Sequence, residues 1–515
     1  MPDVTPAPAK WWRIAAVLLG LLLAGAAVTA AEIGSGGRSP GALAAAGTAA
    51  AAALVCLAAA LAPSRRLQAL SSRWQGVATR LQQRPASISL PAGAALVALA
   101  FVSFSLIVVR LLSIPQDPWD DDQGAFLLTA QEIDAHGGIA WLWAALWSGE
   151  FAEANRHPLY LALLSSAPTL RAGQWLSAAL GAIILTALIA VTMRRSGRRA
   201  AGIAGILLAT NSAFCLFSAR VVCDVLLVGL CGLVWLIHVP GAADTRQRAL
   251  SPLRCAAGGA LLGLAWLTKG TGLPLFAGYM LWLMIVSLWP THRRTEDGQA
   301  VDAPRIGIRV ARPILALIAF LAIASPLIAR NMVRFGNPFH NLNSLLLFAD
   351  RYEELDGMLA RQTTTGDAAR NYLATHSAGD MLRREARGLV WEAFIILRSL
   401  GPAPLDDARL LFGLPLAVLA AARAAARRSA ADALMLIWAG LSWVLFAWYV
   451  PIAAGERFIL PLLAPTLILA ADALARIVTT PDGKVRPWSV AAAILWTVLW
   501  VASCWVSSGF ADRNG

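Results

Sequence analysis

A run of acidic residues lies directly beyond an apolar stretch, in "IPQDPWDDDQGAF" (114–126). The acids are Asp117, Asp120, Asp121 and Asp122. A carboxylate at a helix start, beside Trp119 and close to lipid, has the character of a general base. Clustered like charges would raise the pKa of some members. The plainer alternative is a solvated acidic loop or helix cap. A calcium loop is not supported, because the ligand and glycine spacing of an EF-hand is absent.

Charged residues also lie at the ends of later apolar runs. "SARVVCDVLL" places Arg220 and Asp224 four positions apart, which predicts that they share one face of a helix. "WLTKGTGLP" places Lys269, one of only three lysines, between two apolar runs. Ionisable groups at membrane depth are costly and usually functional. The alternatives are a local ion pair for Arg220 and Asp224 and interfacial snorkelling for Lys269.

Three further stretches set cationic groups beside apolar runs: "NRHPLY" (155–160), "ARNMVRFGNPFHN" (329–341) and "GERFILPLLAP" (455–465). A carboxylate cluster facing several separate cations suits a substrate with an anionic headgroup embedded in lipid and a group to be deprotonated. Neither a Walker loop nor a GxGxxG motif follows a strand, so nucleotide binding has no support.

The elements that would position these residues are membrane spans. The chain has 515 residues, of which 58% are hydrophobic and 14% charged, with a mean hydropathy of +0.62. Soluble globular chains carry about 25% charged residues, so this composition predicts a membrane protein. The six cysteines fall in apolar segments without CxxC or Cys/His spacing, which argues against structural zinc and a disulfide framework. Nothing resembles a cleaved signal peptide.

Runs of about 20 apolar residues predict about thirteen transmembrane helices. The candidate spans are 11–31, 42–62, 91–112, 174–193, 201–218, 222–240, 253–269, 271–289, 311–329, 409–424, 433–450, 457–475 and 488–507.

Positive charge orients these spans. The net charge is +13, but its arginines concentrate in alternate connections, such as "RRSGRR" (194–199) and "RAAARR" (423–428). That distribution indicates a cytoplasmic amino terminus and not a nucleic-acid partner. Two long loops, 113–171 and 331–408, then fall on the external side. "AFLLTAQEIDAHGG" predicts a helix ending at a glycine pair, and "HPLYLALLSSA" is too short to cross the bilayer and is expected to lie at its surface.

Taken together, these stretches resemble the GT-C glycosyltransferases of the protein O-mannosyltransferase and aminoarabinose (lipid A) transferase type, as in glycosyltransferase family 39. "DQGAF" matches the family's acidic motif, with Asp122 in the aspartate position and Gln123 where glutamate is common. "RHPLY", "ARVVCD", "GLAWLTKGTG", "RNMVRFGNPF" and "ERFILPLLAP" resemble further family elements in the same order over about residues 91–475.

The resemblance implies an all-α GT-C fold and a reaction. A polyprenyl-phosphate-linked sugar is donated, with inversion, to a lipid, polysaccharide or protein acceptor on the extracytoplasmic face. Asp122, with Asp121, would be the base. The residues implied in binding the donor phosphate or substrate are Lys269, Arg220, Asp224, Arg330, Arg457, Arg156, His157 and Tyr160. No cofactor is expected; a divalent metal, which some GT-C branches use, is possible but not expected, and no residue is assigned as a metal ligand.

Four regions follow from this reading: two additional amino-terminal spans and a basic loop (1–90), a catalytic core (91–330), the second external loop (331–408) and carboxy-terminal spans (409–515). The expected location is a bacterial cytoplasmic membrane, with the site facing the periplasm or exterior. A flippase for lipid-linked sugars, or another transporter, is the main alternative. Transporters tend to place charges at the bilayer midplane and to contain internal repeats, and neither is evident here. A family member that binds without turnover is the third reading, suggested by Gln123.

Overall fold

The computed structural model describes residues 90–119, 122–240, 250–288, 306–402, 409–427, 429–478 and 487–506. The two predicted amino-terminal spans, and with them almost all of region 1–90, lie outside the described residues, as do Asp120 and Asp121.

Regular structure in these ranges is entirely helical, which confirms the all-α prediction there. The first half contains α4 (Leu90–Leu112), α5 (Asp122–Ala135), α6 (Gly138–Ser148), α7 (Pro158–Leu164), α8 (Leu170–Ser196), α9 (Arg198–Ala209), α10 (Ser212–Phe217), α11 (Asp224–His238), α13 (Pro252–Thr268) and α14 (Gly272–Leu288). The second half contains α15 (Ile306–Phe335), α16 (Asn343–Leu346), α17 (Glu354–Ala360), α18 (Thr365–Thr375), α19 (Ala378–Ser399), α20 (Arg409–Arg427), α21 (Ala430–Tyr449), η1 (Glu456–Phe458), α22 (Leu460–Ile477) and α23 (Pro487–Val506).

Five described helices are long and apolar enough to cross a membrane: α4 from Ala92, α8, α15, α21 and α22. Others that were predicted as spans, such as α11 and α14, are apolar but shorter. The count of about thirteen spans is therefore not confirmed. What the structure does show is a multi-helix membrane protein, with short helices in the segments between the longer ones.

The predicted span 201–218 is two helices and not one, because the chain breaks at Thr210 and Asn211 between α9 and α10. The Asn211 side chain accepts a hydrogen bond from the Phe214 N–H, which makes it the N-cap of α10. It also donates to the carbonyls of Ser399 (2.8 Å) and Gly401 (3.1 Å) at the end of α19. A distant helix end thus stabilises a break that local hydropathy does not reveal.

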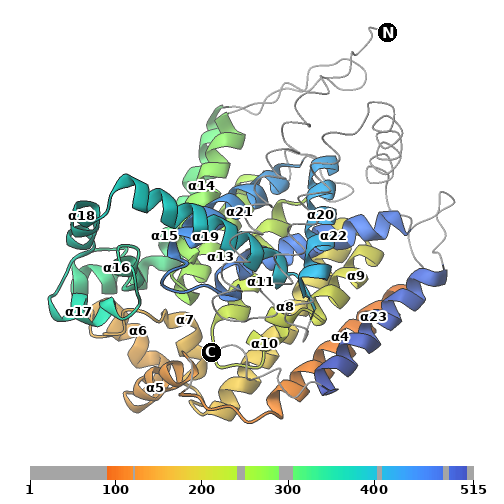
Figure 1. The fold of residues 1–515 in the computed structure, drawn as a ribbon, viewed down its shortest axis with the longest axis horizontal. Coiled ribbons are helices and arrows are strands. Elements are labelled where there is room, and N and C mark those ends of the chain that lie inside the picture. Colours follow the sequence, from red (N-terminus) through yellow and green to blue (C-terminus); the bar gives the residue numbers. More distant parts are fainter. Residues whose placement is uncertain are drawn as a thin grey trace, which may run out of the picture.

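The helices pack around α22, whose apolar window is 83% buried, whereas that of α15 is only 17% buried. Helix α22 contacts α9, α11 and α20, and α15 packs along α13 at the periphery. Small residues permit the latter contact: a Cβ at Gly259 would overlap the backbone of Ala316. Figure 1 shows α4 and α23 side by side at one edge of the bundle, with α5–α7 and α16–α18 gathered at the other.

The described part of the first long loop (113–171) folds as its sequence predicts. Helix α5 ends at Ala135, before two glycines with positive φ (Gly137, +113°; Gly138, +70°). Helix α7, within "HPLYLALLSSA", has seven residues and cannot cross a bilayer. These short helices and the loop after α15 carry residues that meet the ends of the longer helices.

Candidate active site

Asp122 opens α5 and is held there by its neighbours. The turn before it is closed by the Gly124 N–H donating to the Pro118 carbonyl (2.6 Å). Gln123 is 1% exposed; its Nε2 donates to Gln116 Oε1 (3.2 Å) and its Oε1 accepts from the Val221 N–H (2.8 Å). Gln123 thereby ties the start of α5 to the turn before α11. At this position, where the family that the sequence resembles commonly has glutamate, this chain has a buried amide that supports the fold.

Four charged side chains form a continuous chain of ion pairs. Arg457, from η1, pairs with Asp122 through Nη1 and with Asp224 through Nη2 (3.1 Å). Lys269 Nζ lies 2.6 Å from the other Asp224 oxygen. The Asp224 side chain is fully buried, while those of Asp122, Arg457 and Lys269 are 46%, 31% and 18% exposed. The structure therefore brings together four of the predicted residues from four separate segments.

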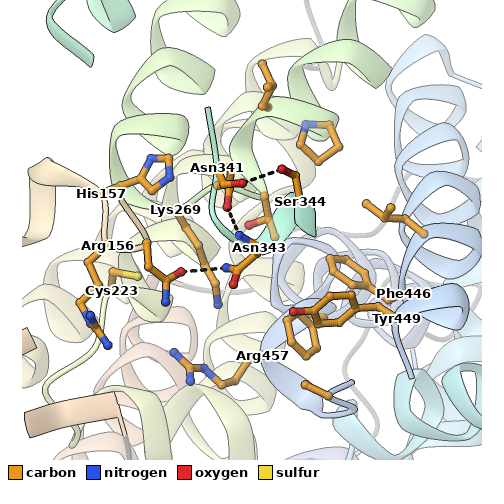
Figure 2. A pocket seen from close by; sticks show the side chains of 18 of the residues that line it. Arg156, His157, Cys223, Lys269, Asn341, Asn343, Ser344, Phe446, Tyr449 and Arg457 are labelled. Atoms are coloured by element: carbon orange, nitrogen blue, oxygen red, sulfur yellow. Dashed lines mark hydrogen bonds between the residues drawn. The ribbon is translucent and has the colours of Figure 1, made fainter. Parts of the chain in front are cut away.

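A cavity of about 590 Å³ opens over this cluster (Figure 2). Among the described residues, its charged lining consists of one carboxylate, Asp122, and three cations, Arg156, Lys269 and Arg457. Another wall is apolar and aromatic, formed by Leu273, Pro274, Leu347, Leu445, Phe446, Tyr449 and Phe458. Ligand sites commonly measure about 300–1,000 Å³ and combine an apolar wall with a few polar groups. This cavity can hold an anionic headgroup that is attached to an apolar chain.

The carboxyl group of Asp122 is ionised in this setting. Burial alone would raise its pKa, but the charge and hydrogen bond of Arg457, with Arg156 and Lys269, lower the pKa below 3.8. The expectation that clustered acids raise one another's pKa is therefore wrong for Asp122, because its described charged neighbours are cations.

Arg156 and His157 both line the cavity but differ in charge. Arg156 is held by Glu153 (3.2 Å), whose Oε1 also accepts the backbone N–H groups of Asn155 (2.7 Å) and Arg156 (3.1 Å). Burial lowers the pKa of His157 to about 4, so it is neutral at physiological pH. Its Nδ1 donates to the Trp266 carbonyl, which leaves Nε2 as an acceptor. Of the two residues in "NRHPLY" that could supply a cationic group, only Arg156 is charged at physiological pH.

Besides the buried Asp224, three predicted residues do not line the cavity. Tyr160 is fully buried, with its hydroxyl 2.7 Å from Ser177 Oγ. Arg330 is 2% exposed and donates to the Glu153 carbonyl, so it supports the loop that carries Arg156. Arg220 lies in the turn before α11, not one helical turn before Asp224 on a shared face as predicted.

Neutral polar residues at the cavity were not predicted. Besides Thr268 and Thr271, they include Asn155, Asn341, Asn343 and Ser344, from the loop before α7 and the segment after α15. Asn343 Nδ2 donates to Asn155 Oδ1 (2.8 Å), and the Ser344 hydroxyl donates to the Asn341 carbonyl (2.6 Å). The only sequence signal was the density of amides in "GNPFHNLNS". Glu153 was also missed, although an acid three residues before Arg156 is a local indication of pairing.

Metal-ligand clusters are not found in the described ranges, where no three His, Cys, Asp or Glu side chains are grouped to hold an ion. The cavity lining offers one carboxylate and one imidazole among its charged and aromatic groups. Asp121, the second predicted catalytic acid, lies outside the described residues.

Comparisons with known proteins give distant structural likenesses. No protein-family model and no curated protein matches the chain. ArnT from Cupriavidus metallidurans bound to undecaprenyl phosphate is similar, with 18% identity and a TM-score of 0.47 over 83% of this chain and 66% of that one. Its apo form gives 17% identity and a TM-score of 0.48, over 82% and 66% of the two chains.

A second similar structure is the archaeal oligosaccharyltransferase AglB from Archaeoglobus fulgidus, in complex with an inhibitory peptide and a dolichol-phosphate. It is 15% identical, with a TM-score of 0.44, over 82% of this chain and 56% of that one. This chain therefore spans about two thirds of ArnT and just over half of AglB. ArnT is an aminoarabinose transferase, so that enzyme type, which the sequence motifs resemble, is also found among the structural neighbours.

Proposed function

We propose that this protein is a membrane glycosyltransferase. It takes a sugar from a polyprenyl-phosphate-linked donor and transfers it to a lipid, glycan or protein acceptor. The reaction takes place at the extracytoplasmic face of a bacterial cytoplasmic membrane. The observation that carries the proposal is the cavity over Asp122, which combines a surplus of cations with an apolar wall.

Asp122 is the proposed general base. Because its pKa is lowered, its carboxylate is ready to accept the proton of an acceptor hydroxyl at neutral pH. As the acceptor hydroxyl loses its proton, its oxygen attacks the anomeric carbon of the sugar. A new C–O bond forms, and the bond from that carbon to the donor phosphate oxygen breaks. Direct displacement of this kind inverts the configuration. The leaving group is the polyprenyl phosphate, and the proton remains on Asp122 until it is lost to solvent.

Lys269, Arg457 and Arg156 are the proposed phosphate-binding groups. The negative charge on the leaving phosphate grows as the bond breaks, and cations already fixed in place stabilise that charge without the reorganisation that water requires. Asp224 lies between Lys269 and Arg457 and orients both. Without donor, Arg457 also pairs with Asp122. A donor phosphate that takes over this guanidinium would release the carboxylate for its role as base.

The apolar wall is the proposed path of the prenyl chain. Leu445, Phe446 and Tyr449 belong to α21, one of the helices long enough to cross the membrane, so a lipid tail leaving the cavity here would meet the bilayer. Undecaprenyl phosphate, which is bound to the similar ArnT structure, is therefore the natural probe.

The test is a transfer assay in proteoliposomes. Purified protein is given a radiolabelled polyprenyl-phosphate sugar together with membranes from the source cell as acceptor. We expect label to appear in a glycosylated product, with an equivalent release of polyprenyl phosphate. A flippase would instead move donor between leaflets and form no product, and that outcome would overturn the proposal.

A further inference from the structure

The neutral amides at the cavity form a group of their own. Asn341 and Asn343 come from the segment after α15, and Asn155 comes from the loop before α7. The Asn343–Asn155 hydrogen bond joins the two segments, and the Asn341 Oδ1 accepts the Asn343 N–H (2.9 Å). In Figure 2, Asn341, Asn343 and Ser344 lie near one another beside Lys269, and Arg457 lies below them.

Several amide atoms in this group are left for a ligand. In the described part of the chain, no hydrogen bond uses the Nδ2 atoms of Asn155 and Asn341 or the Oδ1 of Asn343. All three side chains are partly exposed and line the cavity. The group therefore offers two donors and one acceptor at fixed positions, a pattern that suits hydroxyl groups, which both donate and accept.

A glycine brings this group close to Lys269. A Cβ at Gly270 would overlap the Asn341 Nδ2 and would lie 3.5 Å from the His157 Nε2. Because Gly270 directly follows Lys269, the amide of Asn341 packs against the backbone next to the phosphate-binding cation. A group attached to a phosphate at Lys269 would be within reach of these amides.

The charged residues that line the cavity limit which kind of sugar can bind there. Among the described residues, the only carboxylate that lines the cavity is Asp122, and the proposed mechanism uses it as the base. An ammonium group on the sugar would find three cations and no second acid among the described lining residues, which disfavours it electrostatically. The three cations are those proposed to bind the phosphate, and the amide group itself contains no cation, so a carboxylate on the sugar would have no partner of its own.

We propose that Asn155, Asn341 and Asn343 form the sugar subsite, and that the donated sugar is neutral and rich in hydroxyl groups. This inference rests on the proposed function, because it requires a phosphate-linked sugar at Lys269. It names the substrate class that the transferase accepts: a neutral sugar, and not an amino sugar or a uronic acid.

The experiment measures equilibrium binding to the full-length protein in nanodiscs. The probes are undecaprenyl phosphate alone and its esters with glucose, with a 4-amino pentose and with glucuronic acid. We expect the glucose ester to bind about tenfold more tightly than either charged ester. Asn155→Ala and Asn341→Ala should each weaken binding of the glucose ester by roughly three- to tenfold and leave undecaprenyl phosphate unchanged. Asn371→Ala, on the exposed face of α18, is the matched control and should change neither.

A gain-of-function variant guards against loss through misfolding. Asn341→Asp should improve binding of the amino-sugar ester relative to the glucose ester. Tighter binding of either charged ester by the wild-type protein would overturn the subsite while leaving the transferase proposal intact. If the alanine variants bound all four probes more weakly by the same factor, the subsite would also be overturned and the transferase proposal would stand. Failure of the wild-type protein to bind undecaprenyl phosphate would overturn the proposed function, and with it this inference.

Discussion

Two buried aspartates in this molecule each lie between two basic residues, but their surroundings are very different. Asp224, at the start of α11, lies between Lys269 (2.6 Å) and Arg457 (3.1 Å). Asp472, within α22, lies between Arg423 (2.6 Å) and Arg476 (3.1 Å). Both carboxylates are at most 2% exposed.

The difference is in the cations. Arg423 and Arg476 are 7% and 9% exposed and do not line the described cavity. Lys269 and Arg457 are 18% and 31% exposed, both line it, and Arg457 reaches a second carboxylate, Asp122. A buried aspartate between two basic residues is therefore a structural device that can occur anywhere in the bundle. The cations become available to a ligand only where they face a cavity.

The largest expected effect is in the cluster that faces the cavity, formed by Asp122, Asp224, Lys269 and Arg457. Asp122→Asn should lower kcat for sugar transfer on the order of 10³-fold, because an amide cannot accept the acceptor's proton. Undecaprenyl phosphate should still bind. Asp134→Asn, at the exposed far end of α5, is the matched control and should leave turnover unchanged. Near-normal turnover of Asp122→Asn would remove this residue from the mechanism.

A change in the buried cluster of Asp472, Arg423 and Arg476 should lower the stability of the protein and leave turnover unchanged. Asp472→Asn leaves Arg423 and Arg476 buried without their carboxylate, and we expect it to lower the free energy of unfolding by about 3 kcal/mol. The measurement is denaturant unfolding in mixed micelles, together with kcat per folded molecule. A large fall in kcat at unchanged stability would show that the two clusters do not differ in the way described.

Arg457→Gln should act on both rate and pH dependence. Loss of one charge on the phosphate is expected to lower kcat on the order of 10²-fold. In the wild-type protein, burial raises the pKa of Asp122, but Arg457 and the other nearby cations together lower it by more. Activity should therefore not fall between pH 8 and 5 on account of Asp122. Without Arg457 the effect of burial remains, the pKa rises, and activity should be lost at higher pH than in the wild type. A pH profile of single-turnover rates tests this, and an unmoved acid limb would contradict it.

The smallest expected effect is at Gln123. Gln123→Ala removes the acceptor for the Val221 N–H and should lower kcat by about threefold, through looser placement of α5 against the turn before Asp224. Gln123→Glu keeps an acceptor oxygen and should remain close to wild type. Loss of activity in Gln123→Glu would show that the amide, and not merely an acceptor at this position, is required.

How far the sequence predicts the site depends on the residue type. Asp122, Asp224, Lys269 and Arg457 stand out because ionised side chains beside apolar runs are costly, and the structure brings them together. Asn155, Asn341 and Asn343 do not stand out, because amides are common in loops and only the fold shows that two distant segments place them in one cavity.

Other features depend on contacts that no local pattern contains. The neutral state of His157 follows from burial, helped by the charge of Arg330, more than 100 residues away, and it holds although the Trp266 carbonyl acts in the opposite direction. The break at Asn211 depends on carbonyl groups at the end of α19. Helical character, by contrast, follows from hydropathy and from the glycines after α5, and these were predicted correctly.

The most direct test of the central claim is an experimental structure of the protein with undecaprenyl phosphate. The account predicts the phosphate in the cavity, with its oxygens bonded to Lys269 Nζ and the Arg457 guanidinium, the Asp122 carboxylate released toward the acceptor side, and the prenyl chain along α21. A phosphate bound elsewhere, with the Asp122–Arg457 pair intact and the cavity filled only by water, would contradict it.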